Sequence, residues 1–285
     1  MFVKWVSSGI TINDLVFFEN NGRSSVSSAT LLRYFYQFLD KPPLPKRQRS
    51  LRRSQVYLKI DGSYFKRWGC ILVYKADKRI IYWSFVAREN YFSFCTDLAG
   101  IESLGYQIKG ITSDRNGSLV SVIKNFFPEI PHQFCLVHLQ RNCQSLLTQN
   151  PQTKAGKELL ELILFLNRIT NHYQRDIWLK WFGRLTQRHE ALIRERTYGK
   201  DEVSGRRTWW YTHKNLRRAF RTLHASRENL FLYLDYPDLP KDNNGLEAEF
   251  SHLKGKLNIH RGLTRERRTS FVKWYFYLKS INKTT

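Results

Sequence analysis

Three short segments of the chain place an acidic side chain among small or polar neighbours. Asp61 lies in Ile-Asp-Gly-Ser, Asp114 in Thr-Ser-Asp-Arg-Asn-Gly, and Glu247 in Asn-Asn-Gly-Leu-Glu. Three carboxylates are a minimal protein ligand set for two divalent metal ions about 4 Å apart. Such a pair of ions activates an oxygen nucleophile and stabilises a leaving oxyanion. The residue types therefore suit phosphodiester hydrolysis and strand transfer, with Asp61, Asp114 and Glu247 as the catalytic metal ligands.

Any single acid at the end of a strand is more often a solvated turn residue, so it is the three matching contexts that favour a catalytic interpretation. The third acid has a rival in Glu249, two residues further along the chain. On a helix these two side chains point about 200° apart, so only one of them can face a given site.

Cys135 and His138 form an isolated Cys-x-x-His, with Cys143 nearby. The pattern lacks two of the four ligands of a structural zinc site, and a thiolate is a poor ligand for Mg²⁺. We expect Cys135 to be buried. For His138 two roles stay open: contact with phosphate or with a catalytic acid, or a structural histidine.

The spacing of apolar residues predicts the elements that position the acids. Strands are expected at 56–61, 68–75, 79–86, 107–114 and 132–138, with helices at 91–104 and 116–127. Asp61 and Asp114 then end the first and fourth strands. Three antiparallel strands followed by parallel strands and helices form the ribonuclease H-like α/β fold, in which the first and fourth strands are neighbours. The two aspartates would then meet at a sheet edge where ligands bind in open α/β sheets.

The remaining segments complete the predicted organisation. Residues 1–40 resemble a helix-turn-helix DNA-binding unit, although any short helical hairpin gives the same pattern. Residues 41–54 are a basic, proline-rich linker, and 55–148 form the first part of the core. Helical periodicity alone is seen in 149–240, which we interpret as an all-helical insertion. Residues 241–285 form C-terminal helices that complete the core.

The charge of the chain indicates a polyanionic partner. Lys and Arg number 47 against 24 Asp and Glu, a net charge of +23, and such a field favours nucleic acid because binding releases condensed counterions. An anionic membrane is the alternative, but no segment has the roughly 20 apolar residues that a spanning helix needs. The four scattered cysteines suit a reducing cytoplasm.

Two basic segments are candidates for DNA contact. Residues 206–218 interleave cations with Trp209, Trp210 and Tyr211, whose rings could stack on unpaired bases or fill the core of the insertion. A second run of cations follows Glu247, and Arg33 lies in the N-terminal unit. The cations assigned to DNA are Arg33, Arg206, Arg207, Lys214, Arg217, Arg218, Lys254, Lys256 and Arg261.

Taken in order along the chain, these segments resemble the DDE transposases of the Mutator-like superfamily and related bacterial insertion sequences. The matching pieces are Asp-Gly-Ser at Asp61, Ser-Asp at Asp114, Cys-x-x-His at Cys135 and Asn-x-Leu-Glu at Glu247. The 133 residues between Asp114 and Glu247 (247 − 114) leave room for the long insertion of that family. The resemblance covers residue 55 to the C-terminus.

The resemblance implies a Mg²⁺- or Mn²⁺-dependent enzyme with two ions, acting on the terminal inverted repeats of an element and on target DNA. It also implies a homodimer, because two element ends must be joined, in a bacterial cytoplasm near the nucleoid. Two alternatives stay open. One is a catalytically inactive, transposase-derived DNA-binding protein, and the other is a different ribonuclease H-like DNA nuclease such as a junction resolvase.

Overall fold

A computed structural model describes residues 1–19, 26–44, 54–66, 68–200 and 205–281 of the chain. The chain divides into two compact units. The first comprises Met1–Ile111, Asn116–Ile130 and Asn243–Thr285, and the second comprises Thr112–Arg115 and Pro131–Asp242. Most of the predicted linker, 45–53, lies outside the described residues.

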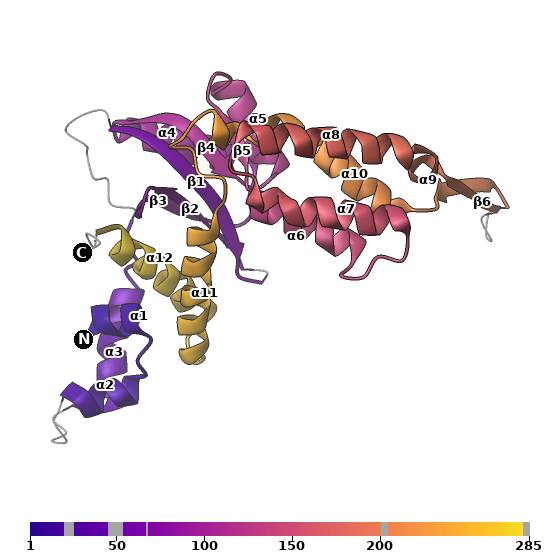
Figure 1. Cartoon of the computed structure of the whole chain (residues 1–285). Coiled ribbons are helices and arrows are strands. Elements are labelled where there is room, and N and C mark those ends of the chain that lie inside the picture. Colours follow the sequence, from indigo (N-terminus) through magenta and orange to yellow (C-terminus); the bar gives the residue numbers. More distant parts are fainter. Residues whose placement is uncertain (20–25, 45–53, 67, 201–204, 282–285) are drawn as a thin grey trace. The chain divides into compact units, whose positions relative to one another are not determined.

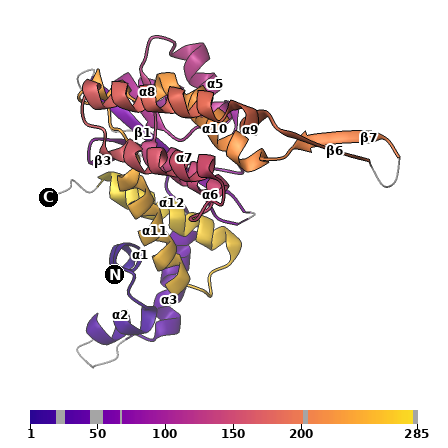
Figure 2. The ribbon, with the colours of Figure 1, turned by 45° about the vertical axis from the view of Figure 1, so that its right-hand side comes forward.

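Most elements of the two units are labelled in Figure 1, and β7 is labelled in Figure 2. The first unit contains α1 (Phe2–Ser8), α2 (Ile12–Glu19), α3 (Ser28–Leu39), β1 (Ser54–Tyr64), β2 (Cys70–Ala76), β3 (Arg79–Val86), α4 (Tyr91–Ser103), most of β4 (Tyr106–Ser113), α5 (Gly117–Phe126), α11 (Asn244–Ile259) and α12 (Arg265–Ile281). The second contains β5 (His132–Phe134), α6 (Leu136–Leu147), α7 (Lys154–Phe165), α8 (His172–Arg188), α9 (Glu190–Arg194), β6 (Arg196–Lys200), β7 (Arg207–Tyr211) and α10 (Lys214–Ser226), with three short 3₁₀ turns.

The principal sheet has five strands in the order β3-β2-β1-β4-β5. β1 and β2 are antiparallel, with Leu58 opposite Ala76 and Tyr64 opposite Cys70, and β2 and β3 are antiparallel as well. The sheet is mixed, antiparallel first and then parallel, which confirms the predicted α/β class and agrees with a ribonuclease H-like fold. β1 and β4 are neighbours, as predicted.

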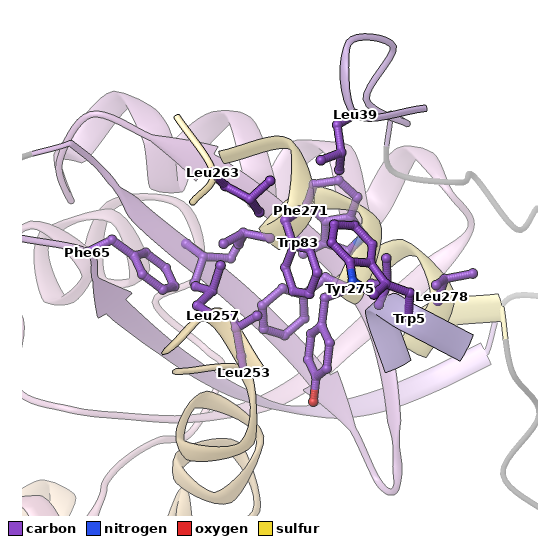
Figure 3. Close-up of a cluster of buried hydrophobic side chains, with 14 of the residues drawn as sticks. Trp5, Leu39, Phe65, Trp83, Leu253, Leu257, Leu263, Phe271, Tyr275 and Leu278 are labelled. Carbon is purple, nitrogen blue, oxygen red and sulfur yellow. The ribbon is translucent and has the colours of Figure 1, made fainter. Parts of the chain in front are cut away.

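Side chains that alternate along β2 build a hydrophobic layer on each face of the sheet. Ile71 and Val73 belong to a cluster with residues of α1, α3, α11 and α12, part of which is drawn in Figure 3. Leu72 and Tyr74 belong to a second cluster with residues of α4 and α5. A strand that is apolar on both faces is typical of a sheet covered by helices on both sides. The two layers hold β1, and thus Asp61, in the middle of the first unit.

Two of the N-terminal helices, α2 and α3, begin at residues whose side chains cap them. At α2, Thr11 and Asp14 bond reciprocally: the Thr11 hydroxyl donates to Asp14 Oδ2 at 2.7 Å, and the Asp14 N–H donates to Thr11 Oγ1 at 3.1 Å. Ser27 caps α3 by accepting from the N–H of Thr30 at 3.2 Å. The sequence does not predict α1, because its seven residues are too few to show a helical period. Tertiary packing instead holds this helix, with Trp5 only 1% exposed.

The second unit has a helical core of its own, formed by residues of α6, α7, α8 and α10. The prediction of an insertion without strands is wrong in one place, since residues 196–211 contain the antiparallel pair β6–β7. Thr197, Tyr198 and residues 208–211 are β-branched or aromatic types that favour strands, but they make a pattern too short to outweigh the helical periodicity around it. Among the described residues, no helix is both long and apolar enough to cross a membrane.

Two tryptophans on α8 allow a matched test of this core. Trp178 is 1% exposed and its Nε1–H donates to the Leu162 carbonyl at 2.9 Å, whereas Trp181, three residues further on, is 41% exposed. Trp178→Ala leaves a cavity and an unsatisfied carbonyl, so we expect it to lower the free energy of unfolding of this unit by about 3–5 kcal/mol. Trp181→Ala should change it by less than about 1 kcal/mol. Urea unfolding followed by circular dichroism measures both, and equal losses would contradict the assignment of Trp178 to the core.

Candidate active site

Asp61 lies within β1, not at its end. The strand continues to Tyr64, and Asp61 pairs with Val73 of β2. The carboxylate is half-buried, and the N–H of Gly62 donates to its Oδ1 at 2.9 Å. The prediction of a strand that stops at Asp61 is thus wrong by three residues, because Ser63 and Tyr64 pair with β2 despite the glycine before them. Within the sheet, Asp61 has a fixed backbone and a backbone donor to one of its oxygens.

Glu89, which the sequence analysis did not single out, lies beside Asp61. Gly62 leaves the space that Glu89 occupies, since a Cβ at position 62 would overlap Glu89 Oε1. The other oxygen, Oε2, accepts from Asn116 Nδ2 at 2.6 Å, and the Glu89 N–H donates to the Tyr64 hydroxyl at 3.1 Å. The signal that could have located Glu89 is the position of an acid just before Asn90, the N-cap of α4. Glu89 therefore connects the residue after Asp61 with the start of α5.

The same carboxylate influences the buried thiol of Cys70. Burial raises the pKa of Cys70 well above its ordinary value, and the neighbouring charges of Glu89 and Asp61 raise it further. The Cys70 Sγ lies 3.6 Å from Glu89 Oε1. A neutral thiol is therefore the neighbour of two carboxylates here, which is compatible with a site built from oxygen ligands.

Glu247 occupies the first turn of α11, whose start is fixed on β1. Asn243, the N-cap position, is fully buried, and its Nδ2 donates to the Ile60 carbonyl at 2.8 Å. Leu246 and Phe250 of the same helix belong to the core cluster with α12. The hydrogen bond joins α11 to the residue immediately before Asp61, so the segments that carry Asp61 and Glu247 lie side by side in the first unit.

The structure separates the two glutamates at the start of α11. Glu249 faces α12, where it accepts from the Tyr275 hydroxyl at 3.1 Å and forms an ion pair with Lys279 at 3.2 Å. Burial, together with the Glu249 charge, raises the pKa of Tyr275. Glu249 is thus used in packing α11 against α12, which favours Glu247 as the acid of the site.

Asp114 belongs to the second unit and directly follows β4. The hydroxyl of Ser113 donates to the Asp114 carbonyl at 2.8 Å and is 2.7 Å from His132 Nε2. Burial lowers the pKa of His132 to about 4, so this imidazole is neutral at physiological pH. The histidine that contacts the strand end before Asp114 is therefore His132, a residue the sequence analysis did not name.

Cys135 and His138 lie at the start of a helix. The predicted strand 132–138 is only His132–Phe134, and α6 begins at Leu136. Cys135 is buried as expected, and its N–H donates to the Ser113 carbonyl at 2.7 Å, which completes the strand pairing and ends it. His138 lies on α6 and faces a cavity of the second unit.

That cavity has a volume of about 280 Å³, and its wall includes Arg115, the residue directly after Asp114. Arg115 and Arg218 contribute two cations to its wall, and His138 lines the same cavity. No acid is among the lining residues, and all of them belong to the second unit. They are Arg115, Phe134, Cys135, His138, Leu139, Asn142, Ser145, Leu146, Arg218 and Thr222.

The other cations assigned to DNA lie in separate places. Arg33 is exposed on α3, and Lys254, Lys256 and Arg261 lie on or just after α11 in the first unit. Burial lowers the pKa of the half-buried Lys256. Arg206, Arg207 and Lys214 lie on the hairpin or at the start of α10. Arg217 is half-buried, stacks on Tyr211 at 3.8 Å and donates to the Ile193 carbonyl at 3.3 Å, so its contacts are structural.

One more buried carboxylate of the first unit is structural. Asp97 of α4 is 3% exposed and accepts from the hydroxyls of Tyr74 and Ser84. Burial raises the pKa of Asp97 to about 6 although both hydrogen bonds lower it.

Within the described part of the chain, no group of three or more His, Cys, Asp or Glu side chains is arranged to hold a metal ion.

These features define the class of protein: it is an α/β protein with a mixed, ribonuclease H-type sheet, in which Asp61 lies on β1 and Asp114 follows β4. Residues 120–254 match the model of the Transposase IS66 family, which is consistent with an insertion-sequence DDE transposase. The match includes Glu247 and begins after Asp61 and Asp114. It gives no support to the Mutator-like part of the resemblance. No curated protein matches the chain.

The hydrogen bond between Asn243 and Ile60 can be tested by mutation. Asn243→Ala leaves the buried Ile60 carbonyl without this donor, so we expect a loss of about 1–3 kcal/mol in the free energy of unfolding. Asn258→Ala, an exposed position near the other end of α11, should cost less than about 1 kcal/mol. Thermal unfolding of both variants measures the difference, and a loss as small at Asn243 as at Asn258 would show that the bond does not hold α11.

Proposed function

We propose that this chain is a metal-dependent transposase that cleaves the ends of a DNA element and joins them to target DNA. The observation that carries the proposal is the 2.8 Å hydrogen bond from Asn243 Nδ2 to the Ile60 carbonyl. It holds the turn with Glu247 against the strand with Asp61, in a chain that matches the IS66 transposases. The net charge of +23 supports double-stranded DNA as the substrate.

Asp61, Asp114 and Glu247 would hold two Mg²⁺ or Mn²⁺ ions, which when bound supply an activated oxygen nucleophile and neutralise the leaving oxygen. Carboxylates brought together without a cation repel one another. The chain therefore has to restrain them by other contacts. The Gly62 N–H does so for Asp61, and Asn243 does so for the turn that carries Glu247. Because two element ends must be joined to one target, we propose that a homodimer performs the reaction.

Glu89 would act as a positioning residue in this scheme. Its contacts with Gly62 and Asn116 link the backbone after Asp61 to the N-terminus of α5. A carboxylate so close to Asp61 also adds negative charge, which strengthens the attraction for a cation. The geometry supports an indirect role for Glu89, through the backbone that carries the proposed ligands.

The proposal predicts that Asp61→Asn abolishes strand cleavage while leaving DNA binding intact. The change keeps the shape of the side chain but removes the charge of a metal ligand, and we expect cleavage to fall at least about a hundredfold. The assay uses purified full-length protein, Mn²⁺ and duplex DNA that ends in the inverted repeats flanking its own gene.

The matched control is Asp77→Asn in the exposed turn between β2 and β3. Its φ of 50° is a conformation that asparagine tolerates, so activity should not change. Cleavage that persists in Asp61→Asn would overturn the proposed site. DNA binding without cleavage by the unaltered protein would identify a catalytically inactive transposase derivative instead.

We also infer that the cavity beside Arg115 receives a phosphate of the DNA backbone. Arg115 and Arg218 supply the positive charge, and Asn142, Ser145 and Thr222 add hydrogen-bonding groups to the same wall. Arginine suits this role because its planar guanidinium can donate two parallel hydrogen bonds to phosphate. A phosphate held there would lie next to the backbone of Asp114.

Arg218→Ala should therefore weaken DNA binding and lower the slope of log affinity against log salt concentration by about one. Arg221→Ala is the control, because Arg221 is also an exposed arginine of α10 but does not line the cavity. Fluorescence anisotropy measured at salt concentrations from about 50 to 200 mM gives both slopes. Equal effects of the two substitutions would mean that α10 attracts DNA only through its general charge.

A further inference from the structure

The pairing of β6 with β7 sorts the hairpin residues by face. Arg196 is opposite Tyr211, Tyr198 is opposite Trp209, and Lys200 is opposite Arg207. Because alternate residues of a strand share a face and cross-strand partners lie on the same side, these residues form one surface. We call it the cation–aromatic face. Its members are Arg196, Tyr198, Lys200, Arg207, Trp209 and Tyr211.

The face combines exposed rings with cations. Tyr198 is 72% exposed and Trp209 is 46% exposed. The Arg196 guanidinium lies over the Trp209 ring, 4.1 Å from its centroid, and so places a positive charge beside this ring. Neither strand contains an acid. Rings of this size normally pack into a core, so their exposure here indicates a surface made for contact.

The opposite face of the hairpin is different in kind. It carries Thr197, Gly199, Thr208 and Trp210 and has no cation. The Trp210 ring lies over Gly199, where an added Cβ would come within 3.1 Å of it. The Thr197 hydroxyl is 2.8 Å from that of Thr212. Each tryptophan thus contacts its own hairpin and the two are similarly exposed, at 46% and 49%, so they differ in that only Trp209 shares its face with cations.

The base of the hairpin is fixed to the helices of the second unit. Arg217 of α10 stacks on Tyr211 at 3.8 Å, and the Thr212 N–H donates to the Glu195 carbonyl at 3.1 Å. Figure 2 shows the two strands extending away from α9 and α10. Tyr198 and Trp209 therefore project from a rigid base, a condition for stacking without a large entropic cost.

We infer that the cation–aromatic face binds unpaired nucleotides of a DNA strand. Tyr198 and Trp209 would stack on bases, and Arg196, Lys200 and Arg207 would contact the phosphates between them. Stacking tolerates any base, and cations favour the polyanionic strand, so the two groups together suit single-stranded DNA. A protein partner matched to such a face would need acids, and an apolar one would gain nothing from the three cations. The inference rests on the proposed function only in taking DNA as the ligand.

The test measures binding of a 2-aminopurine-labelled single-stranded oligonucleotide and of its duplex to the full-length protein in EDTA. Removing the metal prevents cleavage, so the result does not depend on whether the proposed catalytic site is correct. We expect Tyr198→Ala and Trp209→Ala each to weaken binding of the single strand at least about fivefold and to reduce quenching of the label. Trp209→Phe, which keeps a ring, should bind nearly as the unaltered protein does.

Trp210→Ala is the control, because it removes an equally exposed tryptophan next in sequence but on the other face. Its affinity for the single strand should change less than about twofold. Equal losses for Trp209→Ala and Trp210→Ala would overturn the inference, and so would losses that are the same for single strand and duplex. If Tyr198→Ala or Trp209→Ala changed the oligomeric state but left DNA affinity unchanged, the face would be assigned to self-association and the inference would be refuted as well.

Discussion

The position of α11 is the constraint on which the first unit depends, because this helix joins β1 from 183 residues further along the chain. Hydrophobic contacts of Leu246, Leu253 and Leu257 hold the helix in its layer, but apolar contacts alone tolerate small displacements along the axis. A buried amide that donates to one strand carbonyl does not tolerate such a displacement, because a shift would leave the Ile60 carbonyl without its hydrogen bond. The hydrogen bond from the Asn243 side chain to the Ile60 carbonyl therefore holds the start of α11, and the turn with Glu247, against β1.

The other end of α11 is fixed by packing with the N-terminal helices. His260, the residue after the helix, packs against the rings of both Trp5 and Phe271, with ring centroids 4.4 Å and 5.1 Å away. Burial lowers the pKa of His260 to about 4, so it is a neutral ring at physiological pH and packs as one. Residues from both ends of the chain thus form the layer that supports α11, although a sequence-based division would place 1–40 in a unit of its own.

The parts of the structure that could be predicted are those encoded in local pattern. The order of strands and helices along the core and the position of Asp114 after its strand follow from alternation and apolar spacing. Glu89 could not be predicted, since its role depends on Gly62 and Asn116 meeting in space. The β6–β7 pair was missed because two five-residue strands are weak signals beside long helices. Trp5 shows the same limit: tertiary packing, and not helix propensity, fixes α1.

The surplus of positive charge is distributed unevenly, and this explains why composition alone could not locate the DNA-contacting surfaces. Several acids are paired with cations of the same chain: Glu158 with Arg188 at 3.3 Å, Glu249 with Lys279 at 3.2 Å, and Asp40 with Arg267 at 3.1 Å. Each such pair adds almost no net charge to the surface where it lies, so the excess of cations belongs to other parts of the chain. In the strands of the hairpin, by contrast, three cations alternate with rings on one face and no acid interrupts them. Local charge at a surface, and not the total of +23, determines where a polyanion is held, because exposed charges act over a Debye length of only about 8–10 Å.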